Sequence, residues 1–257
     1  MGTLSGARAL VLGVANERSI AWAISRALAA EGARLALTYV GESIERRVRP
    51  LAAEIGAELV LPCDGGDDAQ IAALFDGLRA HWGGLDVLVH AVAFANREDL
   101  AGRFVDTSRD GFRLALDVSA YSLVALARGA LPLLQEAGGG SILTLTFAGS
   151  QRVFPNYNVM GVAKAALESA VRYLAADLGP EGIRVNAISA GPIKTLSAAG
   201  IRDFRQILHA VEERAPLRRN IDADEVASVA ALLAGPAGRA ITGQVIHVDA
   251  GLSILGG

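Results

Sequence analysis

The sequence is poor in cysteine, in aromatic residues and in net charge, and each shortage excludes a class of protein. Cys63 is the only cysteine among 257 residues, so no internal disulfide can form, which fits a reducing compartment. Aromatic residues make up only 5% of the chain, which argues against an aromatic-rich β-sandwich core. The net charge is −3 at pH 7, so no overall positive field favours nucleic acid as a partner.

Long uncharged apolar runs and targeting segments are also missing. Charges such as Arg26, Glu31 and Arg34 interrupt the alanine- and leucine-rich stretches, so no run reaches the roughly 18 residues of a membrane span. The first residues, MGTLSGARALVLG, lack the basic flank and cleavage pattern of a secretory signal. Gly6 stands where a myristoylation motif needs Ser or Thr. We therefore expect a cytoplasmic protein that does not enter a membrane.

What the chain does contain is an alternation of short apolar runs and helical patterns. Hydrophobic residues are 52% of the chain, enough for one large core. The patterns predict strands at 9–13, 34–39, 58–62, 85–90, 141–146, 184–188 and 245–248, and helices at 19–30, 43–55, 70–81, 112–130, 159–178 and 223–233. Pro50 interrupts the second helix, and Pro132 marks the predicted end of the fourth. This order predicts a single α/β domain over residues 1–257, a doubly wound parallel sheet with helices on both faces.

The least regular stretches, 93–110 and 190–222, both follow predicted strands. They should lie at the carboxyl edge of the sheet, where open α/β folds bind ligands. The loop between the first strand and the helix that begins at Ser19 is one candidate, because a helix N-terminus offers N–H groups to a pyrophosphate. Ser19 is also a good helix N-cap residue. The loop has only Gly13 rather than G-x-G-x-x-G, so an ordinary strand–helix turn is an alternative interpretation.

The segment after the second predicted strand leaves the choice between NAD and NADP open. Glu42 lies slightly beyond the strand end where an acidic residue would bind a ribose 2′-hydroxyl. The nearest basic residues, Arg46 and Arg47, fall inside the next helix and so do not mark a 2′-phosphate site. Asp64 follows the third strand and fits either an adenine amino group or a plain turn. His90 ends the fourth strand, where packing is a better interpretation than a role as a base.

Tyr157 and Lys164 are separated by seven positions, which brings side chains to one face of a helix about 10 Å apart. A tyrosine there could donate to a developing oxyanion while the lysine holds sugar hydroxyls. A buried tyrosine and a solvated lysine on an amphipathic helix would show the same spacing. Downstream, Gly191-Pro192 forms a turn that could approach a nicotinamide, with Thr195 near a phosphate.

Together these segments resemble the short-chain dehydrogenase/reductase superfamily, and within it the divergent enoyl-acyl-carrier-protein reductases. The resemblance rests on GVANERSIAWAI at 13–24, HAVAFA at 90–95, DVSAYS at 117–122, PNYNVMGVAKAALE at 155–168, IRVNAISAGPIKTL at 183–196 and ITGQVIHVDAG at 241–251. These motifs span nearly the whole chain in order. The Tyr-x6-Lys spacing is typical of this branch, because most of the superfamily has Tyr-x3-Lys and here that position is Gly161.

The resemblance implies a Rossmann domain that binds a reduced nicotinamide cofactor, NADH, with NADPH not excluded, and no metal. It implies cofactor contacts from Gly13, Ser19, Ile20, Asp64, Gly65, Val92, Lys164, Ile193 and Thr195. The implied reaction reduces the carbon–carbon double bond of a trans-2-enoyl thioester in fatty acid synthesis, with Tyr157 bonding the thioester carbonyl and Ala95 near the acyl chain. The resemblance places Arg202 and Arg205 on a short helix after the Thr195 loop, at positions that contact acyl carrier protein, although plain solvation fits them equally, and it implies a homotetramer.

Two positions depart from the family pattern. Phe147 replaces a second tyrosine ten residues before Tyr157, so its polar role is lost, and Val40 replaces a glutamine typical of members that use NADH. A carbonyl or 3-oxoacyl reductase is an alternative, with Thr144 or Thr146 as the strand hydroxyl, but it would need the other lysine spacing. A non-catalytic nicotinamide-binding regulator is a second alternative, which Phe147 favours and the Tyr157–Lys164 pair disfavours.

Overall fold

Seven strands form one parallel sheet in the order β3-β2-β1-β4-β5-β6-β7 in the computed structural model, which describes residues 2–196, 198 and 204–255. The strands are β1 (Arg8–Leu12), β2 (Arg34–Tyr39), β3 (Leu59–Pro62), β4 (Val87–His90), β5 (Gly140–Thr146), β6 (Ile183–Ala190) and β7 (Val245–Val248). Each of the six neighbouring pairs runs parallel. The predicted doubly wound fold is confirmed.

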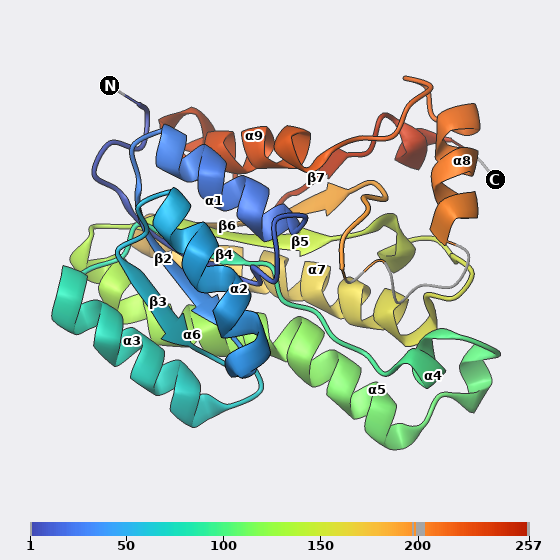
Figure 1. Cartoon of the computed structure of the whole chain (residues 1–257), viewed down its shortest axis with the longest axis horizontal. Coiled ribbons are helices and arrows are strands. Elements are labelled where there is room, and N and C mark those ends of the chain that lie inside the picture. Colours follow the sequence, from blue (N-terminus) through green and yellow to red (C-terminus); the bar gives the residue numbers. More distant parts are fainter. Residues whose placement is uncertain (1, 197, 199–203, 256–257) are drawn as a thin grey trace.

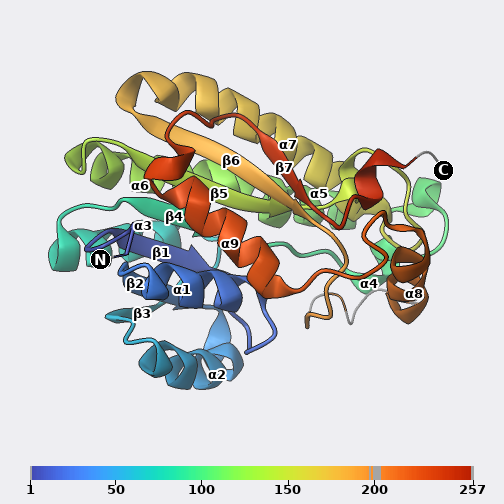
Figure 2. The ribbon, with the colours of Figure 1, turned by 90° about the horizontal axis from the view of Figure 1, so that it is seen from above.

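Helices cover both faces of this sheet (Figures 1 and 2). One face carries α1 (Ile20–Ala30), α2 (Gly41–Glu54) and α9 (Ala223–Ala234). The other carries α3 (Asp68–Trp82), α6 (Ser122–Glu136) and α7 (Asn158–Leu178). The remaining helices, α4 (Arg97–Leu100), α5 (Arg109–Leu116) and α8 (Phe204–Arg214), lie at or beyond the carboxyl end of the sheet.

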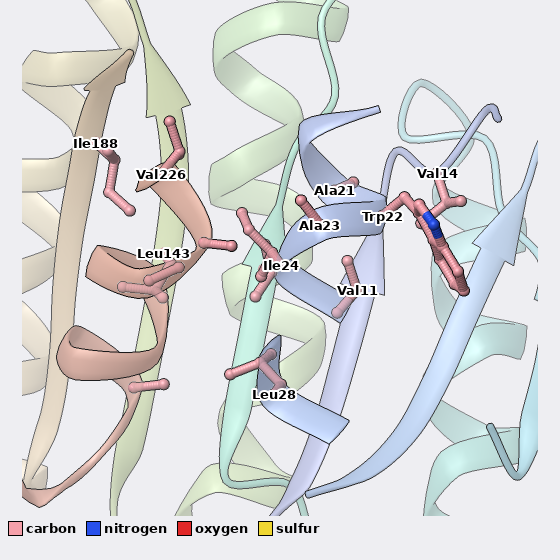
Figure 3. Packing of buried hydrophobic residues seen from close by; sticks show 14 of the residues in the cluster. Val11, Val14, Ala21, Trp22, Ala23, Ile24, Leu28, Leu143, Ile188 and Val226 are labelled. Carbon is pink, nitrogen blue, oxygen red and sulfur yellow. The ribbon is translucent and has the colours of Figure 1, made fainter. Parts of the chain in front are cut away.

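The apolar strands divide their side chains between the two faces. Val11 packs with α1 and α9 in one hydrophobic cluster, whereas its neighbours Leu10 and Leu12 pack with α3, α6 and α7 in the other. Figure 3 shows Val11 beneath Ile24 and Leu28 of α1. Alternate residues of a strand point to opposite faces, so a strand buried on both sides must be apolar throughout.

Local signals fix where two of the helices begin. The Asp67 side chain accepts hydrogen bonds from the backbone N–H groups of Ala69 and Gln70 and so caps α3. Asp222 and Glu225 form a reciprocal capping box at the start of α9. These acidic caps satisfy N–H groups that would otherwise lack a partner.

The predicted end of the fourth helix at Pro132 is wrong. α5, a π-helical turn at Asp117–Tyr121 and α6 follow one another without a break, and Pro132 lies inside α6. Leu133 and Leu134 beyond it are buried against α3 and the sheet. Their burial outweighs the backbone bond that proline removes, and the exposed ring of Pro132 lies on the outer side of the helix. Pro50 is accommodated inside α2 on an exposed side in the same way.

One helical stretch, Arg109–Glu136, is long and apolar enough to span a membrane by length and composition alone. Half of its most apolar window is buried inside the protein, where α6 packs against α3, α7 and the sheet. The stretch is therefore a core helix of this fold.

Candidate active site

The sheet order creates a crevice between β1 and β4. After β1 the chain crosses to β2 on one side, and after β4 it crosses to β5 on the other, so no connection fills the space between their carboxyl ends. Gly13 follows β1 with a φ of +100°, and a Cβ atom there would lie 2.1 Å from the Ala91 carbonyl oxygen. Only glycine fits this position, because both the conformation and the close approach exclude a side chain.

The loop after Gly13 leads to the N-terminus of α1, where Ser19 holds the N-cap position as expected. Its hydroxyl does not cap the helix. The Ser19 Oγ instead accepts hydrogen bonds from the N–H groups of Ala15 and Asn16, at 3.0 and 3.1 Å, and so holds the loop in shape. The first turn, which begins at Ile20, contains no acidic residue. Unlike α3 and α9, this helix has no side-chain cap, so the positive end of its dipole suits an anion from outside.

The candidates for the adenine end follow β3 and β4. Asp64 accepts a hydrogen bond from the N–H of Gly66 at 2.9 Å, so the turn interpretation of this residue describes its present contact. Gly65 is buried against Ser122. A Cβ atom added at Gly65 would lie 3.2 Å from the Cβ atom of Ser122. Val92 lies just after β4 and is partly exposed. All three follow the carboxyl ends of their strands, at the same edge of the parallel sheet as Gly13.

Two of the three basic side chains near the start of α2 are paired on their own helix. Arg46 forms an ion pair with Glu42, and Arg49 forms one with Glu45. Val40, which follows β2, is 53% exposed. Arg47 lies between them, is exposed and forms no ion pair among the described residues.

The catalytic candidates meet at the end of β5. The Lys164 ammonium group donates a hydrogen bond of 2.8 Å to the Leu145 carbonyl oxygen, and the lysine is only 7% exposed. Burial lowers the pKa of Lys164 to about 8, and the negative charge of Glu168 opposes that shift. An ammonium group has three N–H donors, so Lys164 keeps donors for other hydroxyl groups.

Tyr157 lies one residue before α7 rather than within it, which corrects the expectation that both residues share one regular helix. It occupies the N-cap position between Asn156 and Asn158, whose φ angles are +60° and +29°. Asparagine tolerates this left-handed region better than most residues, and strained backbone of this kind concentrates at functional sites. The segment from Tyr157 to Lys164 therefore begins with a tight turn and continues as helix. Helical periodicity alone does not predict this turn.

An aromatic cluster surrounds the tyrosine. The Phe147 ring lies 5.0 Å from the Tyr157 ring in an edge-on arrangement and 4.8 Å from the Phe154 ring. Burial, reinforced by the charge of Glu168, raises the pKa of the Tyr157 hydroxyl above its usual value. Tyr157 is therefore protonated at neutral pH and can donate a hydrogen bond.

His90 is a packing residue, as expected. Its two ring nitrogens each lie 2.8 Å from a hydroxyl, Nδ1 from Thr144 and Nε2 from Ser122. Burial, with a further contribution from the charge of Lys164, lowers the pKa of His90 to about 3, so the ring is neutral. The Thr146 hydroxyl donates to Glu168. Both strand hydroxyls that a carbonyl reductase could use are thus engaged elsewhere.

Three residues that hold the loops around the site were not predicted from the sequence. Ser119, in the π-helical turn, hydrogen-bonds both the N–H and the carbonyl of Phe94 in the loop after β4. Asp99 is buried in the same loop and accepts from the N–H and hydroxyl of Ser108. Glu168 accepts from two hydroxyls at the end of β5. The motif DVSAYS contains Ser119 and the motif at 155–168 ends at Glu168, but neither motif indicates what these side chains contact, and no quoted motif contains Asp99.

The remaining candidates lie around the opening of the site. Ala95, Ile193 and Thr195 are partly exposed in the loops after β4 and β6, and the Thr195 hydroxyl accepts from the N–H of Ala198 at 3.1 Å. Arg205 is exposed on the first turn of α8. Arg202 lies outside the described residues. In the described part of the chain, no group of three or more His, Cys, Asp or Glu is placed to hold a metal ion.

Comparison with known proteins places this geometry in a family. A family model described as enoyl-(acyl carrier protein) reductase matches residues 13–253. The chain belongs to the enoyl-acyl-carrier-protein reductase family.

Individual members are similar over their full length. An NADH enoyl-acyl-carrier-protein reductase from Bacillus cereus is 55% identical, with all of both chains covered. One from Rhizobium meliloti is 52% identical, over 99% of this chain and 93% of its own. A crystal structure of the Bacillus cereus enzyme with NADP+ and indole naphthyridinone superimposes with a TM-score of 0.97, and covers both chains completely. A structure from Anaplasma phagocytophilum in complex with NAD has a TM-score of 0.96 at 47% identity, over 100% of this chain and 97% of its own.

Family membership settles the choice among the three interpretations left by the sequence. The reductase family is confirmed, whereas neither a carbonyl reductase nor a regulator is supported. For this enoyl reductase family member, Phe147 is the departure from the family pattern at the site.

Proposed function

We propose that this chain reduces the carbon–carbon double bond of trans-2-enoyl-acyl-carrier-protein thioesters in fatty acid elongation, with NADH as the reductant. The observation that carries the proposal is the junction of β5 with α7, where a protonated Tyr157 and a buried Lys164 lie around one strand end. This junction shares the carboxyl edge of the sheet with the Gly13 crevice. A reductase needs a cofactor crevice and an oxyanion donor on the same edge.

The residues present fit a nicotinamide dinucleotide. The uncapped N-terminus of α1, preceded by Gly13, suits a pyrophosphate. Lys164 has donors for the nicotinamide ribose, and Ile193 and Thr195 follow β6 where the nicotinamide would lie. We assign Asp64 and Gly65 to the adenine, Val92 to the ribose, and Ser19 and Ile20 to the pyrophosphate.

When bound, NADH would supply the hydride that adds to the β-carbon of the enoyl thioester, and a proton from water would then add to the α-carbon of the resulting enolate. Tyr157 donates a hydrogen bond to the thioester carbonyl oxygen, on which enolate charge develops as the double bond is reduced. Its raised pKa keeps the proton on the tyrosine, so the hydroxyl acts as a donor and not as a base. Lys164 would hold the ribose hydroxyls and so couple to that oxyanion through the sugar. Ala95 and the half-exposed Phe94 border the region where the acyl chain would lie.

The partners follow from the same proposal. Arg205, together with Arg202, would meet acidic helices of acyl carrier protein and act on the encounter rate more than on affinity. We also propose a cytoplasmic homotetramer. Half of the apolar window in Arg109–Glu136 is not buried within one chain, and Tyr121 and Tyr173 are 45% and 72% exposed, which supports a subunit interface over these helices.

The direct test replaces the proposed oxyanion donor. Tyr157→Phe should lower kcat for NADH oxidation with trans-2-octenoyl coenzyme A by about 10²- to 10³-fold, because one donor to the developing charge is lost. The KM for NADH should change little. Loss of absorbance at the reduced nicotinamide band measures both quantities.

Tyr173→Phe is the matched control, since Tyr173 lies on α7, the helix that Tyr157 precedes, and the change removes one hydroxyl but keeps the exposed ring assigned to the subunit interface. It should leave kcat unchanged. Full activity of Tyr157→Phe, or no turnover by the wild-type enzyme with any enoyl thioester, would refute the proposed function.

A further inference from the structure

Glu168 is a buried carboxylate that the reaction described above does not use. It lies on α7, one turn after Lys164, and is only 6% exposed. Its Oε1 atom accepts hydrogen bonds from the hydroxyls of Thr146 at 2.7 Å and Ser150 at 2.6 Å. Both partners are neutral. A carboxylate is costly to bury unless its hydrogen bonds are satisfied, so an internal carboxylate held by two hydroxyls calls for an explanation.

The two hydroxyls lie on either side of Phe147. Thr146 is the last residue of β5, and Ser150 is the last residue of the 3₁₀ turn Ala148–Ser150. By bonding both, Glu168 closes the segment 146–150 onto α7. Lys164 fixes the strand one residue earlier, through the Leu145 carbonyl oxygen. Two side chains one helical turn apart thus hold the end of β5 and the turn that follows it.

This turn forms a wall of the tyrosine site. A Cβ atom at Gly149 would lie 2.5 Å from Cδ1 of Tyr157, so the backbone of Gly149 lies directly against the tyrosine ring. A Cβ at Gly161 would lie 2.7 Å from the Gly149 carbonyl oxygen, so the same backbone also touches α7. The Phe147 ring contacts the tyrosine ring edge-on from the other end of the turn.

We propose that Glu168 is a positioning residue that clamps the 146–150 turn against the Tyr157 ring and thereby fixes the direction of the Tyr157 hydroxyl. The proposal deepens the proposed function, because it rests on Tyr157 as the oxyanion donor. The negative charge of Glu168 also favours the protonated forms of Tyr157 and Lys164. It adds to the rise that burial causes in the pKa of Tyr157, and it offsets part of the fall that burial causes in the pKa of Lys164.

The kinetic test separates positioning from binding. Ser150→Ala should lower kcat with trans-2-octenoyl coenzyme A about tenfold, with the KM for NADH within twofold of wild type, because a displaced catalytic group loses rate and not cofactor affinity. Glu168→Ala should lower kcat about 100-fold, and Glu168→Gln should rescue part of that loss, since an amide keeps one acceptor oxygen. Ser150→Ala added to Glu168→Ala should have almost no further effect.

A spectroscopic test does not depend on turnover. The chain has four tyrosines, so a protein labelled with ¹³C at the tyrosine ζ position gives four resonances, and Tyr157→Phe identifies one of them. Ser150→Ala and Glu168→Gln should shift or broaden the Tyr157 resonance alone. If that resonance moves while no enoyl thioester is turned over, positioning stands and the proposed function fails.

Glu58→Gln is the matched control for removal of a carboxylate from a hydrogen-bond network. Glu58 accepts from Arg34 and Trp82 beside the β2–β3 edge of the sheet, away from the β5–α7 junction. It should lower thermal stability but leave both kcat and the Tyr157 resonance unchanged. Wild-type kcat in Ser150→Ala, additive losses in the double variant, or an unmoved Tyr157 resonance in every variant would each overturn the proposal.

Discussion

At the scale of single residues, the site places one hydroxyl among aromatic rings. Phe147 packs edge-on against Tyr157 and contacts Phe154, so its ring serves as a support for the tyrosine. An edge-on pair stabilises by about 0.5–1.5 kcal/mol beyond its buried area. The polar contribution that a second tyrosine would make is absent, so in the proposed mechanism Tyr157 is the donor by itself.

Restoring the hydroxyl should therefore have a small effect. Phe147→Tyr keeps the ring and adds one polar atom, so we expect kcat to change less than about fivefold and the melting temperature to fall slightly if the new hydroxyl lacks a partner. Steady-state kinetics and thermal unfolding measure these effects. Activity that appears only in Phe147→Tyr would mean that Phe147 has disabled the natural site.

At the scale of elements, the decisive unit is β1, its glycine turn and α1. Gly13 closes this turn at a φ of +100° beside the Ala91 carbonyl, and that approach brings the N-terminus of α1 to the crevice. The geometry of the whole unit depends on a position without a side chain.

Gly13→Ala should weaken NADH binding at least tenfold and destabilise the fold by about 1–3 kcal/mol, because the backbone must move to relieve both strain and overlap. Titration of NADH fluorescence and chemical unfolding measure the two effects. Gly6→Ala is a suitable control: Gly6 has a φ of +78° with no atom near the added Cβ. It should reduce stability without changing NADH affinity, and an equal loss of affinity in both variants would contradict the cofactor assignment.

The elements themselves were largely predictable from the sequence. The ranges 34–39 and 245–248 agree with β2 and β7, and most other boundaries differ by one or two residues, because apolar runs flanked by glycine or aspartate are strong local signals. Sequence patterns gave the wrong result at Pro132, which lies inside α6, and did not predict the π-helical turn. At both places tertiary packing outweighs the local preference of the residues.

The site was predictable only in part. The spacing of Gly13, Tyr157 and Lys164 could be recognised in the sequence. The contacts of Asp99 and Glu168 could not, because their hydrogen-bond partners lie 9 and 22 residues away along the chain. Helix α8 falls in a stretch interpreted as irregular, apart from the short helix implied by the family resemblance.

At the scale of the whole molecule, exposed and half-exposed carboxylates contribute to its pH dependence. Hydrogen bonds from Arg34 and Trp82 lower the pKa of Glu58 to about 2, and bonds from Arg219 and the Asp222 backbone lower that of Glu225 to about 2. A carboxyl group whose pKa is lower in the folded state stabilises the fold above its unfolded pKa, near 4.5. That contribution is lost as the pH falls from there toward 2.

Stability should therefore begin to fall below about pH 6.5, because the unfolded chain protonates His90 while the folded chain keeps it neutral, and should fall further below about pH 5 as these carboxylates lose their advantage. Glu58→Gln should be less stable than wild type at pH 7, and the difference should shrink at pH 3, where the wild-type carboxylate begins to lose its advantage. Urea unfolding at the two pH values measures the difference. A gap as large at pH 3 as at pH 7 would show that the lost contacts, and not ionisation, determine the effect.

The all-parallel order of the sheet also has a consequence for how the chain reaches its native state. With no hairpin among the seven strands, every strand pairing must close a loop that contains an intervening helix or a long connection. β1 takes its second neighbour, β4, only after more than a third of the chain has been synthesised, because β4 ends at His90 of 257 residues. Until then β1 presents an open edge, so the crevice between β1 and β4 cannot form before that point of synthesis.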